Sequence, residues 1–374
     1  MKILFMLDKR VNRGSIQAVA NYVRAGEELG YVVALHGRPD PAFPAMRFST
    51  EIGAFDYVVL IFESGLDWLS ALRLPRLLAG IARERRLILD ADGMYDAVVC
   101  VDGYDRNHVD EAARRRWVAH FQAISDRVAQ PTFACRELGA DPLPFYGYDA
   151  RAHRDRCTPK RWDVLHVGHN WWRWREVSGV LLPALEQART RIGGVCFLGS
   201  WWQAPPAGAS ELGLEAAFEV DPDMFRRLGI EVRPPVPYTE VIPAMSRSRV
   251  NIMTQRPLFR ALRLITSKYF EIFSADTIPL VALDRDHAES VYGLAGRELT
   301  LGDPDGVAEK IVDALARPRY YRDLVEEVRR HLVEHHSYRR RLEELTALLS
   351  SGVAVGADRR SALVATTRQG GRSA

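Results

Sequence analysis

Cysteine and long apolar runs are scarce in this 374-residue sequence. Its four cysteines are widely separated, with no C-x-x-C pair and no spacing typical of a zinc site. They are Cys100, Cys135, Cys157 and Cys196. No stretch reaches the roughly 18 apolar residues of a membrane-spanning helix, and no signal-peptide cleavage site follows the short apolar start. We therefore expect a cytoplasmic protein with reduced thiols, no metal and no transmembrane segment.

An excess of one charge is also missing, because 51 basic residues face 48 acidic ones and leave a formal charge of +3. Nucleic-acid-binding domains carry a marked basic excess, so the balance argues against a nucleic-acid partner. The glycine motif G-x-G-x-x-G is absent after the first predicted strand, where the sequence reads LDKRVNRGS. This absence argues against a Rossmann dehydrogenase.

What is present is an alternation of strand-like apolar runs with helical periodicity, which predicts parallel sheets of the α/β class. In the first half, strands are predicted at 2–7, 31–35, 57–62 and 86–89, with helices over 16–29, 66–83 and 107–120. In the second half, strands are predicted at 164–167, 195–198, 230–232, 250–253 and 278–282, with helices over 177–189, 238–246, 267–274, 304–315 and onward to about 349.

This pattern predicts two Rossmann-like domains that face each other across a cleft. We expect an N-terminal domain at 1–155 and a C-terminal domain at 160–333, separated by a polar linker. A closing helix at 334–350 would pack back on the first domain, and 352–374 would be a disordered tail. Polar and aromatic clusters follow the predicted strands, where ligands bind in such sheets.

Residues 266–283, TSKYFEIFSADTIPLVAL, resemble the donor-site signature of group 1 glycosyltransferases of the GT-B fold. Three other segments match features of this family in order, namely 142–150, 235–253 and 335–345. The resemblance is nearest to the spore-maturation (CgeB-like) branch. It implies transfer of a sugar from a UDP, GDP or ADP sugar to a glycan or small-molecule acceptor, with no bound metal.

The resemblance also implies a donor site at the start of the helix predicted over 267–274. Thr266, Ser267 and Lys268 would hold the diphosphate, and Glu271 would accept hydrogen bonds from the ribose. The segment that contains Tyr238 would bind the base. An ordinary amphipathic helix with a surface Lys–Glu pair is the alternative interpretation.

In this fold the loop after the first strand of the second domain lies under the donor phosphates. Here that loop begins with Gly168 and continues with His169, Asn170 and three tryptophans. Arg173 or Arg175 would neutralise the diphosphate, and Ser200 follows the next strand. Five of the eight tryptophans lie between 171 and 202, where they would line the ligand or pack between the domains.

Acidic residues at predicted strand ends of the first domain are candidates for the base of an inverting transfer. Among Asp8, Glu63, Asp90 and Asp92, we favour Asp92 and Glu63. The sequence DADG at 90–93 leaves a magnesium site as an alternative, and a retaining mechanism would need no such base.

One position departs from the family pattern, in which an acid often stands eight residues before the ribose glutamate. Arg263 stands there in this chain. This departure favours the alternative of a catalytically inactive binding or scaffold protein. A nucleotide-sugar epimerase of the same fold is a further alternative.

Overall fold

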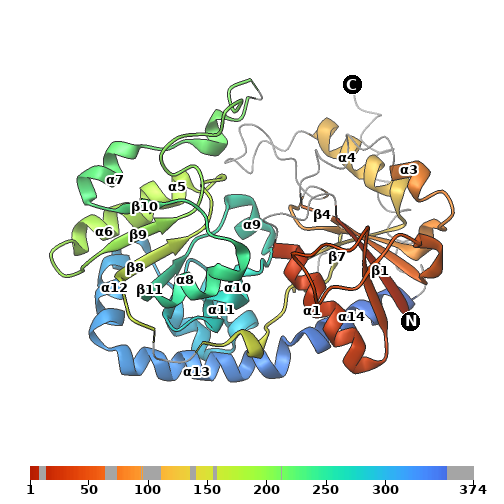
Figure 1. Ribbon diagram of the computed structural model, residues 1–374. Coiled ribbons are helices and arrows are strands. Elements are labelled where there is room, and N and C mark those ends of the chain that lie inside the picture. Colours follow the sequence, from red (N-terminus) through yellow and green to blue (C-terminus); the bar gives the residue numbers. More distant parts are fainter. Residues whose placement is uncertain are drawn as a thin grey trace, which may run out of the picture. The chain divides into compact units, whose positions relative to one another are not determined.

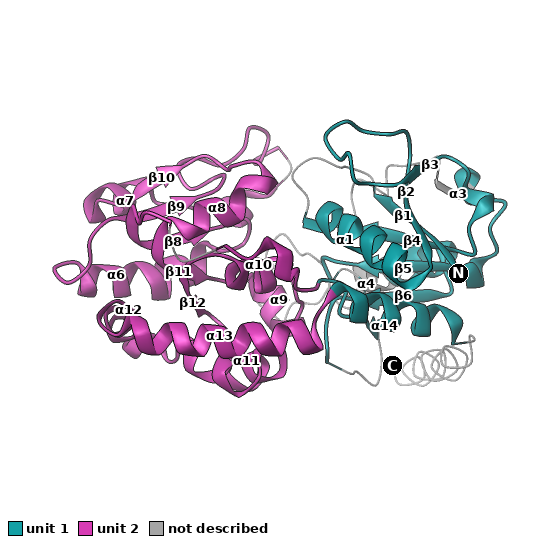
Figure 2. Ribbon diagram, turned by 60° about the horizontal axis from the view of Figure 1, so that its bottom comes forward, with its two compact units in different colours: residues 1–99, 109–146, 338–374 teal, residues 100–108, 147–337 magenta. Residues whose placement is uncertain are grey.

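The structure is a computed structural model that describes residues 1–7, 14–63, 74–93, 95, 111–134, 140–154, 158–211 and 213–351 (Figure 1). These residues form two compact units, which Figure 2 colours separately. Unit 1 contains the described parts of 1–99, 109–146 and 338–351, and unit 2 contains 147–337. Asp8, Cys100, Cys135, Cys157 and the predicted tail at 352–374 lie outside the described residues.

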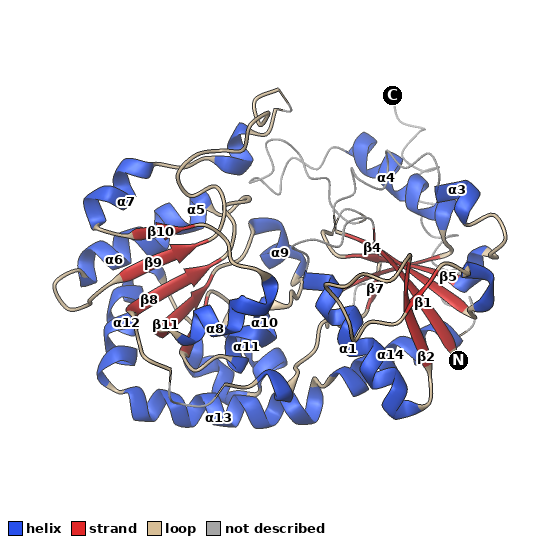
Figure 3. Ribbon diagram, viewed as in Figure 1, coloured by secondary structure: helices blue, strands red, loops and turns tan. Residues whose placement is uncertain are grey.

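Unit 1 is built on a seven-stranded sheet with the order β3-β2-β1-β4-β5-β6-β7, in which every pair of neighbours is parallel. The strands are β1 (Lys2–Leu7), β2 (Val32–His36), β3 (Phe48–Ser49), β4 (Tyr57–Phe62), β5 (Arg86–Asp90), β6 (Arg127–Gln130) and β7 (Asp141–Pro142). The central strands are almost wholly buried because helices cover the sheet (Figure 3).

The helices of unit 1 are α1 (Gly14–Leu29), α3 (Leu74–Leu77), α4 (Glu111–Ile124) and α14 (Tyr338–Ser350), with 3-10 turns at Ile52–Ala54 and Arg83–Arg85. The helix predicted over 66–83 is wrong at its C-terminal end, because α3 stops at Leu77. A turn follows, in which the backbone N–H of Ile81 donates to the carbonyl of Leu78 at 2.9 Å. Gly80 lies in that turn and favours a break in the helix.

The helix α14 belongs to the core of unit 1, although it comes from the far end of the described chain. Tyr22 of α1 is fully buried and meets Tyr338 edge-on, with ring centroids 5.6 Å apart. The hydroxyl of Tyr22 donates to the carbonyl of Phe145 at 2.9 Å. The guanidinium of Arg127 donates to the carbonyl of Leu349 at 3.2 Å, which satisfies the C-terminal end of α14.

Unit 2 contains a five-stranded parallel sheet with the order β10-β9-β8-β11-β12. Its strands are β8 (Trp162–Val167), β9 (Val195–Leu198), β10 (Glu231–Arg233), β11 (Ser248–Met253) and β12 (Ile278–Val281). The strands β9 and β10 are added on one side of β8, and the chain then crosses to the other side to form β11 and β12. The same change of side occurs next to β1 in unit 1, where β2 and β3 lie on one side and β4 on the other. Ligands of doubly wound sheets bind at such switch points.

The helices of unit 2 are α5 (Trp174–Glu176), α6 (Leu182–Ala188), α7 (Pro222–Leu228), α8 (Val241–Ser246), α9 (Pro257–Leu262), α10 (Lys268–Ser274), α11 (Arg285–Tyr292), α12 (Val307–Ala316) and α13 (Pro318–His335). A π-helical turn at Val177–Leu181 joins α5 to α6, and further 3-10 turns lie at Glu215–Phe218, Tyr238–Glu240, Leu294–Leu299 and Pro304–Gly306. Among the helices of the described ranges, none is long and apolar enough to cross a membrane. Cys196 is a buried free thiol of β9.

Candidate functional site

Two glycines bring the loops after β8 and β9 into direct contact. A Cβ atom on Gly199 would lie 2.0 Å from the carbonyl oxygen of Gly168, so this position has no room for a side chain. The indole N–H of Trp202 donates to the same oxygen at 2.7 Å. The carboxyl ends of β8 and β9 are thus locked together by backbone contact.

Asn170 adds further hydrogen bonds between these loops. Its side-chain amide donates to the carbonyls of Trp201 at 3.1 Å and Glu219 at 2.8 Å, and the residue is fully buried. Trp172 and Trp201 have left-handed backbone conformations, with φ values of 56° and 68°. Bulky residues adopt this conformation rarely, so the surrounding contacts must hold both loops in place.

His169 lies half-buried at the rim of these loops. The backbone N–H of Ser200 donates to its Nδ1 atom at 3.0 Å, and its ring lies 5.4 Å from that of Trp201. Burial, together with repulsion from the nearby cations Arg173, Lys268 and Arg256, lowers the pKa of His169 to about 4. The imidazole is therefore neutral at pH 7.

Three cations gather where β8 and β11 end, and we call Arg173, Arg256 and Lys268 the cation cluster. Arg173 donates through Nη1 to the carbonyl of His169 at 2.7 Å. Burial lowers the pKa of the Arg173 guanidinium, and repulsion from Arg256 adds to this shift. Burial lowers the pKa of Lys268 as well, with repulsion from Arg173 as the second cause. Crowded, partly buried cations are a good match for an anionic ligand.

Two carboxylates accompany the cluster. Lys268 contacts Glu271 of α10 at 3.1 Å, and burial raises the pKa of this carboxyl group. Its second oxygen, Oε1, is buried without a hydrogen-bond partner in the described structure. Glu176 accepts the backbone N–H of Gln255 at 3.3 Å and pairs with Arg260, so it links the loop after β8 to the loop after β11.

Thr266 and Ser267 precede α10 and are half-buried. Ser267 occupies the N-cap position in a helical conformation, and its hydroxyl makes no capping hydrogen bond. The carbonyl of Ser267 accepts the backbone N–H groups of Phe270 and Glu271, both at 3.0 Å. The side chains of Thr266 and Ser267 therefore remain available beside Lys268.

The remaining predicted donor residues differ in their surroundings. Arg175 is exposed on α5, whereas Tyr238 is half-buried in its 3-10 turn. Arg263 ends α9 with a left-handed φ of 51° and is exposed, with its guanidinium 3.7 Å from Asp284. Ser200 contributes backbone groups to the loop contact, since its carbonyl accepts the N–H of Asn170 at 3.0 Å.

The tryptophans mainly form the interior of unit 2. Trp172, Trp174 and Trp202 are buried, and the ring of Trp202 packs against His166 with centroids 5.3 Å apart. Trp171 and Trp201 are half-buried and both contact Phe218, at 4.8 and 4.9 Å. Three of the five clustered tryptophans thus build the core under the loops.

In unit 1, Glu63 and Asp92 lie half-buried after β4 and β5 and share a tyrosine neighbour. The hydroxyl of buried Tyr146 donates to Glu63 at 3.4 Å, and the same oxygen accepts the N–H of Ser15 at 3.3 Å. Ser15 lies in the first turn of α1, whose N-terminus favours a carboxylate. Burial raises the pKa of Tyr146 well above its usual value, and the negative charges of Glu63 and Asp92 raise it further.

Asp90 has a structural role. It is fully buried, and its Oδ2 atom accepts the N–H of Tyr95 and the side-chain amide of Gln130, both at 2.8 Å. Across the described ranges, no group of three histidine, cysteine or acidic side chains is arranged to hold a metal ion.

Sequence reasoning did not single out Arg256 or Tyr146. Arg256 follows the strand predicted at 250–253, but its neighbours in the sequence give no sign of proximity to Arg173. Tyr146 lies in the apolar segment LPFYGY, where a tyrosine is an ordinary core residue. Only the fold brings each of them to its site.

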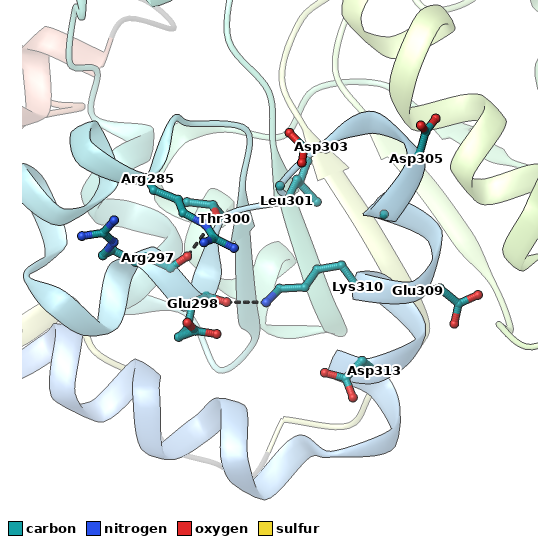
Figure 4. A pocket seen from close by; sticks show the side chains of 12 residues that line it. Arg285, Arg297, Glu298, Thr300, Leu301, Asp303, Asp305, Glu309, Lys310 and Asp313 are labelled. Carbon is teal, nitrogen blue, oxygen red and sulfur yellow. Dashed lines mark hydrogen bonds between the residues drawn. The ribbon is translucent and has the colours of Figure 1, made fainter.

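A surface pocket of unit 2 is lined by residues from α11, α12 and the segment between them (Figure 4). Its charges are largely paired: Arg297 contacts Glu289 at 2.7 Å, and the ammonium of Lys310 donates to the carbonyl of Glu298 at 2.6 Å. None of the cation cluster residues lines this pocket.

Residues 175–347 match the sequence family described as "Glycosyl transferase-like". No curated protein matches the chain in sequence. Among solved structures, an α-glucosyltransferase in complex with UDP is 11% identical with a TM-score of 0.60, covering 94% of this chain and 99% of its own. T4 phage β-glucosyltransferase is 10% identical with a TM-score of 0.53, covering 94% and 100%.

An α-glucosyltransferase bound to UDP and a 13-mer DNA is 12% identical with a TM-score of 0.55, again covering 94% and 100%. The two parallel sheets and these likenesses show the GT-B fold. Glycosyl transfer is the function class that the family match supports, and α10 and the helices that follow it in unit 2 lie within the matched residues.

Proposed function

We propose that the protein transfers a sugar from a nucleoside-diphosphate sugar to a glycan or small-molecule acceptor. The observation that carries this proposal is the cation cluster at the switch point of unit 2. Arg173 and Arg256 come from the loops after β8 and β11, and Lys268 begins α10. Three cations at this edge of a doubly wound sheet suit the two phosphate groups of such a donor.

In this proposal, Lys268, Thr266 and Ser267 bind the diphosphate together with Arg173, while Glu271 receives the ribose hydroxyls. The alternative of a surface Lys–Glu pair fits poorly, because Glu271 is only 7% exposed. A buried carboxylate oxygen without a partner is costly, and a small movement that admits a diol would satisfy it. Tyr238, Gly168, Asn170, Ser200 and Arg175 are the further donor-side residues of the proposal.

The chemical step would break the bond between the anomeric carbon and the diphosphate and form a bond to the acceptor oxygen. In an inverting reaction, Glu63 or Asp92 would take the acceptor proton. The three cations would neutralise the leaving diphosphate, which is why we propose a reaction that needs no metal. T4 phage β-glucosyltransferase has been solved with UDP and Mn²⁺, so a chelator test is required.

The nearly balanced charge of the chain favours a glycan or small-molecule acceptor over DNA. We also propose that the nearest relatives of this chain belong to the spore-maturation (CgeB-like) branch. Some of the similar structures contain DNA. Duplex DNA should therefore be tested as an acceptor beside glycans and small molecules.

Calorimetric titration with UDP, GDP and ADP tests the donor site, with a Glu271→Ala variant beside it. We expect micromolar binding of one nucleotide that weakens at least tenfold in the variant. UDP is the first choice, since similar structures contain it. Glu309→Ala, an exposed residue of α12, is the matched control and should bind normally. Absence of binding to all three nucleotides would favour the scaffold alternative.

Product analysis separates transfer from epimerisation. Incubation with donor alone should leave the sugar configuration unchanged, whereas an epimerase would convert it without an acceptor. With an acceptor present, Glu63→Gln and Asp92→Asn should each be compared for a loss of kcat with an unchanged KM for the donor. Full activity of both variants would contradict a base in unit 1.

A further inference from the structure

We propose that His169 is a fixed hydrogen-bond donor to an oxygen of the bound diphosphate and that it never serves as the base. The identity of the ligand rests on the proposed function. The tautomer of the imidazole ring rests on the geometry of the loops after β8 and β9.

The tautomer follows from one hydrogen bond. A backbone N–H group can only donate, so the N–H of Ser200 at 3.0 Å requires a lone pair on the Nδ1 atom of His169. The proton of the neutral ring must then lie on Nε2. Protonation of Nδ1 would break this contact, which the locked backbones of Gly168 and Gly199 hold in place.

The neighbouring charges favour the same neutral form of the ring as this hydrogen bond. The charged groups that act on His169 are Arg173, Lys268 and Arg256, and each of them disfavours a positive imidazole. The ring of Trp201 packs beside it and carries no charge. In the free protein His169 therefore stays neutral near pH 7, and its basic nitrogen, Nδ1, is already occupied by the N–H of Ser200.

The Nε2–H group is the free side of the ring. It makes no hydrogen bond within the described structure, and it is not sealed from solvent as the Nδ1 atom of His166 is. A neutral hydrogen-bond donor next to three cations adds a directional contact to a site that would otherwise bind its ligand by charge alone. A phosphate oxygen is the acceptor that this combination of groups fits.

Nitrogen-15 NMR of the imidazole rings tests the tautomer in the free protein, with the His169 signal assigned by its loss in His169→Gln. We expect the Nε2–H tautomer throughout pH 6–8. A proton on Nδ1, or titration of the ring within this range, would overturn the inference.

Titration with UDP, GDP and ADP tests the ligand. We expect His169→Ala to weaken binding of the preferred nucleotide by roughly tenfold or more, the usual effect of losing a hydrogen bond to a charged group. Gln can place an N–H₂ near the Nε2 position, so His169→Gln should recover part of this loss. His335→Ala on α13 is the control and should bind normally, and circular dichroism checks that each variant is folded.

Equal affinity of His169→Ala and the unsubstituted protein would overturn the phosphate contact and leave the proposed function intact. If the unsubstituted protein bound no nucleotide, the proposed function and the phosphate contact would both be refuted. The NMR result would then still decide whether His169 can act as a base.

Discussion

At the scale of single residues, the proposed donor site depends on close contacts that leave no room for added atoms. Gly199 lies against the carbonyl of Gly168, and the buried amide of Asn170 satisfies two loop carbonyls. These contacts position His169 and Arg173 before any ligand arrives. Preorganised donors avoid the entropy cost of ordering a loop during binding.

Gly199→Ala should destabilise the protein by about 3 kcal/mol, because its Cβ atom would overlap a backbone oxygen that cannot rotate away. Denaturant unfolding followed by circular dichroism measures the change. Gly306→Ala is the control, since a Cβ atom there would meet nothing within 4 Å and should change stability by less than about 1 kcal/mol. Equal unfolding midpoints for the two variants would contradict the close contact.

Nucleotide affinity should fall as the pH rises above 7. Burial, together with repulsion from Arg173, lowers the pKa of Lys268 to about 7, and a bound diphosphate would favour its protonated form. Above that pH, binding must therefore take up a proton, and affinity falls by up to about tenfold per pH unit. Calorimetry between pH 6.5 and 8.5 measures the slope.

Lys268→Arg should remove this slope, because a guanidinium stays charged over the whole range. Lys160→Arg, which replaces a lysine paired with Asp276, should keep it. A flat profile in the unsubstituted protein would show that Lys268 does not contact the diphosphate.

At the scale of elements, the sequence predicts continuous apolar strands and the short helices α8 and α10, but it misses other short elements. The apolar run Tyr57–Phe62 is predicted with its observed bounds, because a strand buried on both faces reads as one continuous hydrophobic stretch. β6, with the sequence RVAQ, is missed because its terminal side chains are polar and find partners only in the fold. The short helix α9 is missed because six residues show no clear period.

The candidate site shows the same division. A loop after a strand makes Arg173 and His169 candidates, and the family resemblance makes Lys268 and Glu271 candidates. Long-range proximity, such as that between Arg256 and Arg173, depends on the order of the strands, which periodicity alone does not give.

Glu176 should be a positioning residue that ties the two cationic loops together. Glu176→Ala leaves the N–H of Gln255 and the guanidinium of Arg260 without their acceptor, which should cost about 1–3 kcal/mol of stability and weaken nucleotide binding. Glu186→Ala, an exposed residue of α6, should change neither. Thermal unfolding and calorimetry measure both effects, and unchanged values for Glu176→Ala would refute the link.

At the scale of the whole molecule, each unit has its own sheet and core, but unit 1 is assembled from separated parts of the chain. Its helix α14 supplies Tyr338 and the fully buried Arg341, which lies over the ring of Phe133 at 5.5 Å. The core of unit 1 is therefore incomplete without the last described helix.

A chain that ends at Ser337 should lose the cooperative unfolding transition of unit 1, because Tyr22 and Arg127 would lose their partners in α14. A chain that ends at Ser351 keeps these contacts and serves as the control. Differential scanning calorimetry separates the two, and an unchanged transition in the shorter chain would show that α14 is dispensable.

This arrangement also affects how the protein is made. A ribosome completes 147–337, the contiguous part that folds as unit 2, before it reaches α14. The surface around Tyr22 in the earlier-synthesised part of unit 1 therefore stays uncovered until α14 emerges. We expect this waiting period to be when the nascent chain depends most on chaperones, and a ribosome stalled just before residue 338 would hold the chain in that state.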